Sequence, residues 1–360
     1  MIELLCFIFI LFGTLFRRGK LLAFFFLVFL WICFGWSGEN ADTNIYLFRY
    51  KYYKDITSTT EPIFTYLVKI SNSFDLNYYG FLIITSLFFI ISLMILVKKL
   101  EVKYVLVPYV LFLIFPFVMS VVIVRFTLAA AFIIYGFSFL VDKKKYWWQI
   151  YTLCVIIASL IHSSSVFFIL LLMVNNFSVK KIIRISIIFL LALLFISTLL
   201  KYVINADVLF LSEKMSEVNN EVENMEKTSF NYYFGTITRT LIPFCVFLFS
   251  YFKFYKKNIT KYSAKTVNII ETTLKINLLF LSSIGLYFIS VDFSRLLFPL
   301  LFLNYCVYAL IMEKSKANMM LMLILLISCG LELYLLVLRY DFMVENVFEP
   351  FFNNRLFEDL

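Results

Sequence analysis

The sequence predicts an all-α polytopic integral membrane protein with about twelve transmembrane helices and long extracytoplasmic loops. Of its 360 residues, 62% are hydrophobic and the mean hydropathy is +0.92, whereas soluble globular domains are about 45 to 50% apolar. The apolar residues gather in runs of roughly the 17 to 25 residues that cross a bilayer. Lysine-rich loops alternate along the chain with loops that carry most of the acidic residues.

The apolar runs mark the expected spans, with short polar breaks between them. They lie near residues 2–16, 21–37, 78–97, 104–120, 122–141, 146–161, 164–177, 182–203, 236–253, 269–290, 295–312 and 318–338. The runs beside His162 are short, so re-entrant helices are an alternative to full spans there. Arg17 and Arg18 follow the first run and no small-residue cleavage site is present, so that run is expected to be a retained span rather than a signal peptide. With 9 Gly and 6 Pro, the chain has little material for linkers, and we expect a single transmembrane domain over residues 1–360.

The loop charges predict the orientation of these spans. Basic residues concentrate in alternate loops near residues 17–20, 98–103, 143–145, 180–184, 253–265 and 314–316. Such loops are cytoplasmic by the positive-inside rule, which places both termini outside. Two outer segments are long, residues 38–77 and 204–235. In the second, apolar residues recur close to helical spacing, which predicts an amphipathic helix on the outer surface, with a lid over a site as the sharper alternative.

Several classes of function find no support in the sequence. The six cysteines are scattered through apolar runs without a CxxC spacing and His162 is the only histidine, so neither a disulfide framework nor a metal site is expected. No nucleotide-binding motif occurs, and we expect no cofactor. The net charge of +9 follows from the inner loops, so nucleic acid is not an expected partner.

Four arginines on the expected outer side are candidates for binding an anion. Arg125, Arg239 and Arg295 each stand at the start of an apolar run that leads inward, and Arg49 lies in the first outer loop. An arginine in a span costs about 2.5 to 3.5 kcal/mol at the helix centre, and its guanidinium suits phosphate oxygens. Each arginine alone could instead reach the interface or pair with an acid, as Arg295 could with Asp292. Their shared depth favours a common anionic substrate.

Acid–base candidates lie on the same side. Histidine is the side chain best suited to act as a general base or a phosphate ligand near neutral pH, which makes His162 a candidate, although a lone histidine at a membrane edge is more often a satisfied polar residue. Asp42 and Glu61 flank the tyrosine-rich part of the first outer segment and are further candidate bases, with solvated loop charges as the alternative. Tyr46 and Tyr50 are candidate platforms for sugar rings, with an aromatic belt at the lipid headgroups as the alternative.

Short motifs in a fixed order resemble the EpsG-type, Wzy-like polysaccharide polymerases, which join the repeat units of O-antigen, capsule or exopolysaccharide. They are Asp42-x-x-x-Tyr46-x-x-x-Tyr50, Glu61-Pro62-Ile63-Phe64, Val124-Arg125-Phe126-x-Leu128-Ala129, Ala158-Ser159-Leu160-Ile161-His162-Ser163-Ser164 and Arg295 at the start of a late span. Phe126 stands where the family often has glutamine. The resemblance implies a fold similar to that of GT-C-like glycosyltransferases.

The resemblance also implies an activity, partners and a location. The enzyme would transfer a glycan from undecaprenyl diphosphate to a hydroxyl of a second lipid-linked unit, on the periplasmic or outer face of the bacterial cytoplasmic membrane. The arginines would stabilise the charge that develops on the lipid diphosphate, and His162, Asp42 or Glu61 would take the proton of the acceptor hydroxyl. Membrane lipids, and as an optional partner a chain-length regulator of the Wzz type, complete the expected surroundings.

Three other functions compete with polymerisation. A lipid-linked oligosaccharide flippase or another transporter would need no catalytic base, and its charges would be spread through the depth of a central cavity. An O-antigen ligase would use the same arginines and histidine, so the sequence separates it poorly from a polymerase. A membrane O-acyltransferase would leave the several outer arginines unexplained.

Overall fold

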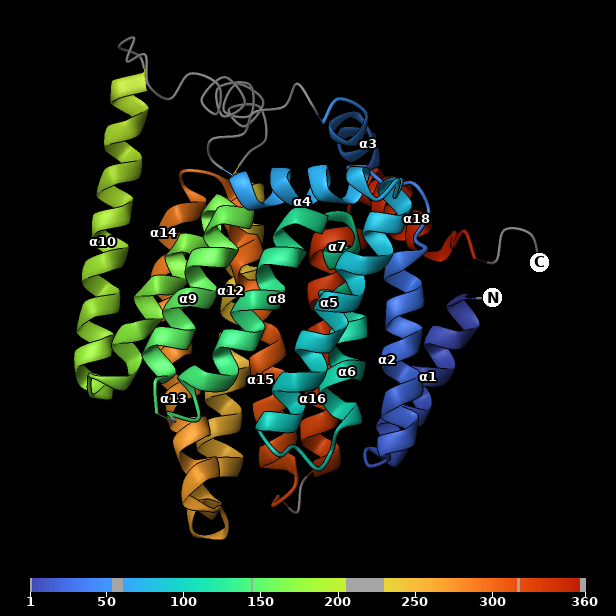
Figure 1. Cartoon of the computed structure of the whole chain (residues 1–360). Coiled ribbons are helices and arrows are strands. Elements are labelled where there is room, and N and C mark those ends of the chain that lie inside the picture. Colours follow the sequence, from blue (N-terminus) through green and yellow to red (C-terminus); the bar gives the residue numbers. More distant parts are fainter. Residues whose placement is uncertain (1, 54–60, 144, 205–229, 316–317, 357–360) are drawn as a thin grey trace.

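The computed structural model describes residues 2–53, 61–143, 145–204, 230–315 and 318–356, and within these ranges the regular structure is helical (Figure 1). The predicted all-α class is therefore confirmed. Most of the predicted amphipathic helix at 204–235 lies outside the described residues, as do residues 54–60 of the first outer segment.

The elements follow the apolar runs closely. In chain order they are α1 (Ile2–Phe16), α2 (Lys20–Gly35), α3 (Thr43–Lys51), α4 (Pro62–Ser73), α5 (Tyr78–Lys99), α6 (Leu106–Ile114), α7 (Phe117–Val122), α8 (Val124–Leu140), α9 (Trp147–Ile161), η1 (Ser163–Asn175), α10 (Val179–Ile204), α12 (Phe230–Ser250), η2 (Tyr251–Tyr255), η3 (Lys256–Lys261), α13 (Ala264–Phe280), η4 (Leu281–Ser283), α14 (Ile284–Tyr287), η5 (Val291–Leu296), α15 (Leu297–Met312), α16 (Asn318–Leu333), η6 (Tyr334–Leu338), α17 (Asp341–Met343), η7 (Val344–Phe348) and α18 (Glu349–Phe352).

The length and composition of its helices indicate that the chain is a multi-pass membrane protein. Among the described residues, 6 continuous helical stretches are long and apolar enough to cross a bilayer: Tyr78–Lys99, Val179–Leu199, Gly235–Lys261, Ala264–Tyr287, Val291–Met312 and Asn318–Leu338. Shorter apolar helices are α1, α2, α8, α9 and η1. The number twelve stays a prediction.

Two of the predicted spans have a different local structure. The run at 104–120 divides into α6 and α7, because Phe115 is extended and Pro116 follows it; a residue before proline is disfavoured in the α conformation. The run at 164–177 forms the 3₁₀ helix η1, whose 13 residues reach about 26 Å at a rise of roughly 2.0 Å per residue. A 3₁₀ helix thus extends a short apolar run further than an α-helix would.

Helix α15 forms the centre of the bundle, since all of its residues are buried. It packs against α6, α8, α12 and α13. Asn304 of α15 and Asn277 of α13 exchange two amide hydrogen bonds of 2.8 and 2.9 Å. Hydrogen bonds of this kind between membrane helices contribute about 0.6 kcal/mol on average and up to about 2, so the pair fixes the register of α15 more than it adds stability.

The basic loops meet at one end of the bundle, here called the lysine-rich end. Lys265 Nζ lies 2.5 Å from Glu101 Oε1 and 4.0 Å from Asp142 Oδ1, and the Lys103 amide donates to Glu313 Oε1 over 2.5 Å. These contacts join four loops that are far apart in the sequence. Figure 1 shows the α1–α2 turn and the α12–α13 connection at the bottom, and α3, α4 and α18 at the top. The top is called the opposite end below.

Helices α3 and α4 cover the opposite end, and α4 lies across the ends of the upright helices (Figure 1). The C-terminal segment holds the chain where it leaves α2. Arg355 donates from Nε to the Ser37 carbonyl over 3.0 Å and its guanidinium stacks 3.5 Å from the Tyr79 ring centre. A Cβ atom on Gly38 would lie 2.3 Å from the Asn353 carbonyl oxygen, so only glycine permits this close approach.

Candidate active site at the opposite end

The start of α4, the start of α8 and the end of α9 meet and bring Glu61, Arg125 and His162 together. Glu61 precedes Pro62 at the start of α4, and proline is well suited to the first position of a helix. Arg125 lies in the first turn of α8. His162 follows α9 in an extended conformation (φ −146°, ψ 114°) and separates α9 from η1. The breaks between the predicted helices therefore produce the site.

The Glu61 carboxylate bridges the other two side chains. Its Oε2 lies 2.6 Å from Arg125 Nη1, and its Oε1 lies 2.9 Å from His162 Nδ1. Glu61 is 5% exposed, whereas the side chains of Arg125 and His162 are 24% and 20% exposed. The Glu61 carboxylate is thus the most deeply buried group of the cluster, and the side chains of Arg125 and His162 reach the surface.

Interactions with His162 and Arg125 offset the cost of burying the Glu61 carboxylate. Burial raises the pKa of Glu61, but the hydrogen bond from His162 and the charge and hydrogen bond of Arg125 outweigh it and lower that pKa from 4.5 to about 2. Glu61 is therefore ionised at neutral pH. A positive side chain near the N-terminus of α8 is unfavourable for the helix dipole, and an anion there is favourable, so Glu61 also compensates for the position of Arg125.

Aromatic residues hold the cluster from both sides. The Tyr46 hydroxyl accepts a hydrogen bond from the Arg125 amide at 3.3 Å, which satisfies a donor that the first turn of a helix leaves open. The Tyr46 ring stacks on Tyr78 with centres 6.0 Å apart. The rings of Phe126 and His162 form a T-shaped pair with centres 5.5 Å apart. The orientations of Arg125 and His162 are thus fixed by packing as well as by Glu61.

Asp42 and Arg295 lie beside this cluster. Burial raises the pKa of Asp42, the Arg295 and Arg125 charges oppose this rise, and the Asp292 charge adds to it. Arg295, Arg125 and Asp292 are thus all within electrostatic range of Asp42. Arg295 pairs with Asp292 at 2.6 Å, in agreement with the acid pairing that the sequence offers as an alternative for this arginine. Asp42, Glu61, Arg125, His162 and Arg295 are therefore brought together at one end of the bundle.

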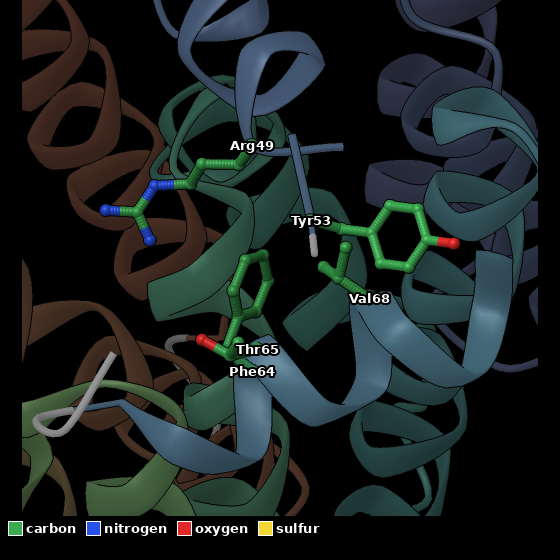
Figure 2. Close-up of a pocket in the computed structure, with 5 residues that line it drawn as sticks. All are labelled: Arg49, Tyr53, Phe64, Thr65 and Val68. Atoms are coloured by element: carbon green, nitrogen blue, oxygen red, sulfur yellow. The ribbon is translucent and has the colours of Figure 1, made fainter. Parts of the chain in front are cut away.

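Arg49 lies over a separate small pocket between α3 and α4. Figure 2 shows its side chain reaching from α3, while Phe64, Thr65 and Val68 project from α4 and Tyr53 closes another side. Its predicted role in diphosphate binding remains a prediction.

The two tyrosines expected to bind sugars have their rings inside the protein. Tyr46 is 5% exposed and Tyr50 is 7% exposed, and the Tyr50 hydroxyl donates to Ser71. Stacking on a sugar needs an open ring face, so their positions favour packing roles, and sugar binding by them stays a prediction.

Arg239 has a different position from the one expected, because it does not open its helix. Helix α12 begins at Phe230, and Arg239 lies well inside it, 9% exposed. Its Nη2 donates to Thr236 Oγ1 over 2.8 Å. Glu332 of α16, which is 2% exposed, lies within its electrostatic range. Arg239 thus belongs to a second, buried cluster.

Three contributors to the site escaped the sequence-based prediction. Tyr78 lies in an apolar run and Phe126 is prominent only as a departure from the family motif, and their contacts with Tyr46 and His162 depend on the fold. Asp292 was noted only as a partner for Arg295. The order Asp-x-x-Arg gave a signal for that pair, because residues three apart share a helix face. Among the described residues, no group of three or more histidine, cysteine or acidic side chains could hold a metal ion.

Comparison with known proteins gives one match. The model of the EpsG family matches residues 20–348, which include all the residues of the cluster described above. No curated protein and no solved structure matches the chain, so the likeness to GT-C-like glycosyltransferases stays a prediction. Because the match covers most of its length, the chain belongs to the EpsG family, which indicates a membrane protein with a polysaccharide polymerase-like role.

Proposed function

We propose that the protein joins lipid-linked oligosaccharide repeat units by glycosyl transfer at the end of the bundle opposite the lysine-rich loops. The donor is a glycan on undecaprenyl diphosphate, and the acceptor is a sugar hydroxyl of a second lipid-linked unit. By the positive-inside rule this end faces the outside of the cytoplasmic membrane. The family membership and the cluster of Glu61, Arg125 and His162 support the proposal.

The observation that carries the proposal is the pairing of Glu61 with both Arg125 and His162. Because both carboxylate oxygens are engaged, Glu61 orients its neighbours rather than removing a proton itself. When its Nδ1 donates to Glu61, neutral His162 carries its free lone pair on Nε2. A carboxylate that fixes the tautomer and orientation of a histidine makes the other ring nitrogen an effective base.

The reaction follows from these positions. The acceptor oxygen attacks the anomeric carbon of the donor, its proton passes to His162 Nε2, and the bond between that carbon and the diphosphate oxygen breaks. Negative charge then develops on the leaving diphosphate. Arg125 and Arg295 stabilise this charge, as cations placed where charge develops do in other group transfers.

Arg125 has a donor suited to this role. Its Nε is buried and has no hydrogen-bond partner among the described residues, and an unpartnered buried donor is costly. A phosphate oxygen would satisfy it. Asp42, whose pKa is raised by burial, is the second carboxyl of the site and a candidate for binding the acceptor sugar or relaying its proton.

The proposal is tested by deleting the gene and separating the cell-surface glycans by size. We expect loss of the polymer ladder with single repeat units retained, and we expect Glu61→Gln, Arg125→Ala and His162→Ala to reproduce this loss at normal protein levels. Glu345→Gln is the matched control, because Glu345 is an exposed carboxylate of the C-terminal segment. Normal ladders in all three site variants would overturn the proposal. Loss of every repeat unit on deletion would instead identify a flippase or a ligase.

A further inference from the structure

The two arginines of the candidate site are bonded to carboxylates of different kinds. Arg125 is bonded to Glu61, which is 5% exposed and is also bonded to His162, so this carboxylate is held from two sides. Arg295 is bonded to Asp292, and the side chains of these two residues are 33% and 57% exposed. The carboxylate of Arg125 is therefore fixed in the protein, whereas Arg295 can exchange its carboxylate for another anion.

The 3₁₀ conformation of η5 accounts for the exposed pair. A 3₁₀ helix has about 3 residues per turn, so side chains three positions apart lie above one another, as those at positions 292 and 295 do. Val291 and Leu296 are buried, and Phe293 packs against Phe167 of η1 with ring centres 5.5 Å apart. These apolar contacts hold the helix in place, so opening of the exposed pair needs no change in the packing of η5.

An anion that binds Arg295 meets Asp292 in either of two geometries. If the anion takes the place of the carboxylate, it displaces an ion pair whose atoms are 2.6 Å apart. If it binds beside the carboxylate, two negative charges lie close together and repel each other. An exposed ion pair is weak, so Asp292 lowers the affinity of Arg295 for an anion without preventing binding.

We infer that Asp292 competes with the lipid diphosphate for Arg295 and thereby promotes release of the product. The inference rests on the proposed function. Glycosyl transfer turns a diphosphate diester into a lipid diphosphate, whose freed terminal phosphate ionises a second time near neutral pH. The product thus carries more negative charge than the donor, and cationic groups bind it more tightly. A carboxylate that returns to Arg295 opposes this product inhibition.

Binding of farnesyl diphosphate, a short lipid diphosphate, tests the inference. It is titrated calorimetrically into the full-length protein in detergent, and the Kd is compared between the unchanged protein and Asp292→Asn. We expect the Kd to fall about fivefold in the variant, which corresponds to about 1 kcal/mol. Asp341→Asn is the matched control, because it removes an equal charge from an exposed carboxylate of the C-terminal segment, and its Kd should be unchanged. An unchanged or higher Kd in Asp292→Asn would overturn the inference.

Further variants show whether Asp292 acts through Arg295. Arg295→Gln should raise the Kd for farnesyl diphosphate, and adding Asp292→Asn to that variant should give no further change. A gain in affinity that persists without Arg295 would overturn the competition, because Asp292 would then act only as a general negative charge. Asp292→Glu keeps a carboxylate and should keep the Kd within about twofold of that of the unchanged protein.

Turnover gives a readout that a merely structural role would not change. With a lipid-linked donor, Asp292→Asn should lower both KM and kcat, because the variant binds the donor more tightly and releases the product more slowly. Added undecaprenyl diphosphate should inhibit the variant about fivefold more strongly than the unchanged protein. A higher KM without stronger inhibition would mean that Asp292 only holds Arg295 in position, and would overturn the inference.

These measurements separate the role of Asp292 from the catalytic proposal. A lower Kd in Asp292→Asn together with normal glycan ladders in the Glu61 and His162 variants would leave a diphosphate site without the proposed chemistry. An unchanged Kd together with lost ladders would leave the polymerase and overturn the role of Asp292.

Discussion

Two carboxylates near arginines in this molecule differ in almost every other respect. Glu61 lies at the end of the bundle and is bonded to Arg125 and His162. Glu332 lies inside α16, and neither of its oxygens has a hydrogen-bond partner among the described residues. Arg239 lies within its electrostatic range but donates to Thr236. Both carboxylates are buried, but both oxygens of Glu61 are bonded, whereas Glu332 has no hydrogen-bond partner among the described residues.

The difference shows what a charged residue in a membrane protein can do at each depth. At the bundle end, three helix termini bring three side chains together, and the engaged carboxylate holds Arg125 and His162 in position. Inside the bundle, an ionised carboxylate without hydrogen bonds would cost several kcal/mol. We therefore propose chemistry for the Glu61 cluster, whereas diphosphate binding by Arg239 stays a prediction.

Glu61→Ala is the change expected to have the largest effect. It leaves Arg125 without its carboxylate and frees the His162 ring, so polymer formation should fall by more than about 10³-fold. Removing one partner of a buried ion pair also costs about 3 to 5 kcal/mol of stability. Ladder analysis and thermal melting in detergent check the two effects, and Glu345→Gln should change neither. Retained polymer would show that the bridge is dispensable.

His162→Asn should come next, because asparagine keeps a donor for Glu61 but cannot take a proton at neutral pH. We expect a loss of about 10² to 10⁴ in the rate of polymer formation, with the thermal midpoint close to that of the unchanged protein. If histidine only binds phosphate, the variant should instead raise the KM for the donor and leave kcat largely unchanged. Steady-state kinetics with a lipid-linked donor distinguish the two outcomes.

The stability of the protein should depend on pH through the Glu61 carboxylate. The pKa of Glu61 is lowered from 4.5 to about 2 in the folded protein, so its contribution is complete above pH 4.5 and is lost as the pH falls toward 2. The loss amounts to about 3 kcal/mol. The thermal midpoint should therefore fall more steeply over this window in the unchanged protein than in Glu61→Gln. If the thermal midpoints of the two proteins fall in parallel with pH, the pKa of Glu61 is the same in the folded and unfolded states.

Part of this arrangement could be predicted from the sequence, because bilayer thickness and apolar runs determine where helices form. The motif order also placed Asp42, Glu61, Arg125, His162 and Arg295 in one site. The partners within that site could not be predicted, since Glu61 lies 64 and 101 positions from its two partners and any outer arginine could pair with any outer acid.

Arg239 shows why depth is harder to predict than membership of a helix. The apolar run begins at 236, but α12 begins at Phe230, because polar and tyrosine residues can form a first turn that hydropathy does not reveal. A shift of six residues moves a side chain by about 9 Å along a helix, which separates an edge position from a buried one.

Arg239→Gln tests whether Arg239, at its buried position, contributes to catalysis. The change loses a charged hydrogen bond to Thr236, so stability should fall by about 1.5 to 3 kcal/mol. Turnover per folded molecule should stay within about twofold, since no contact links Arg239 to the Glu61 cluster in the described residues. A large loss of turnover at normal stability would support the prediction that Arg239 binds diphosphate.

Glu332→Gln should have the smallest effect of all. Glutamine has nearly the same shape and replaces an acid that makes no hydrogen bond to the part of the chain that the structure describes, so the change should be close to neutral for stability. We expect a change in the free energy of unfolding within about 1 kcal/mol and unchanged ladders. A loss of polymer would mean that Glu332 exchanges protons or binds a cation during turnover, and the distinction between the two carboxylates would then be one of partners rather than of function.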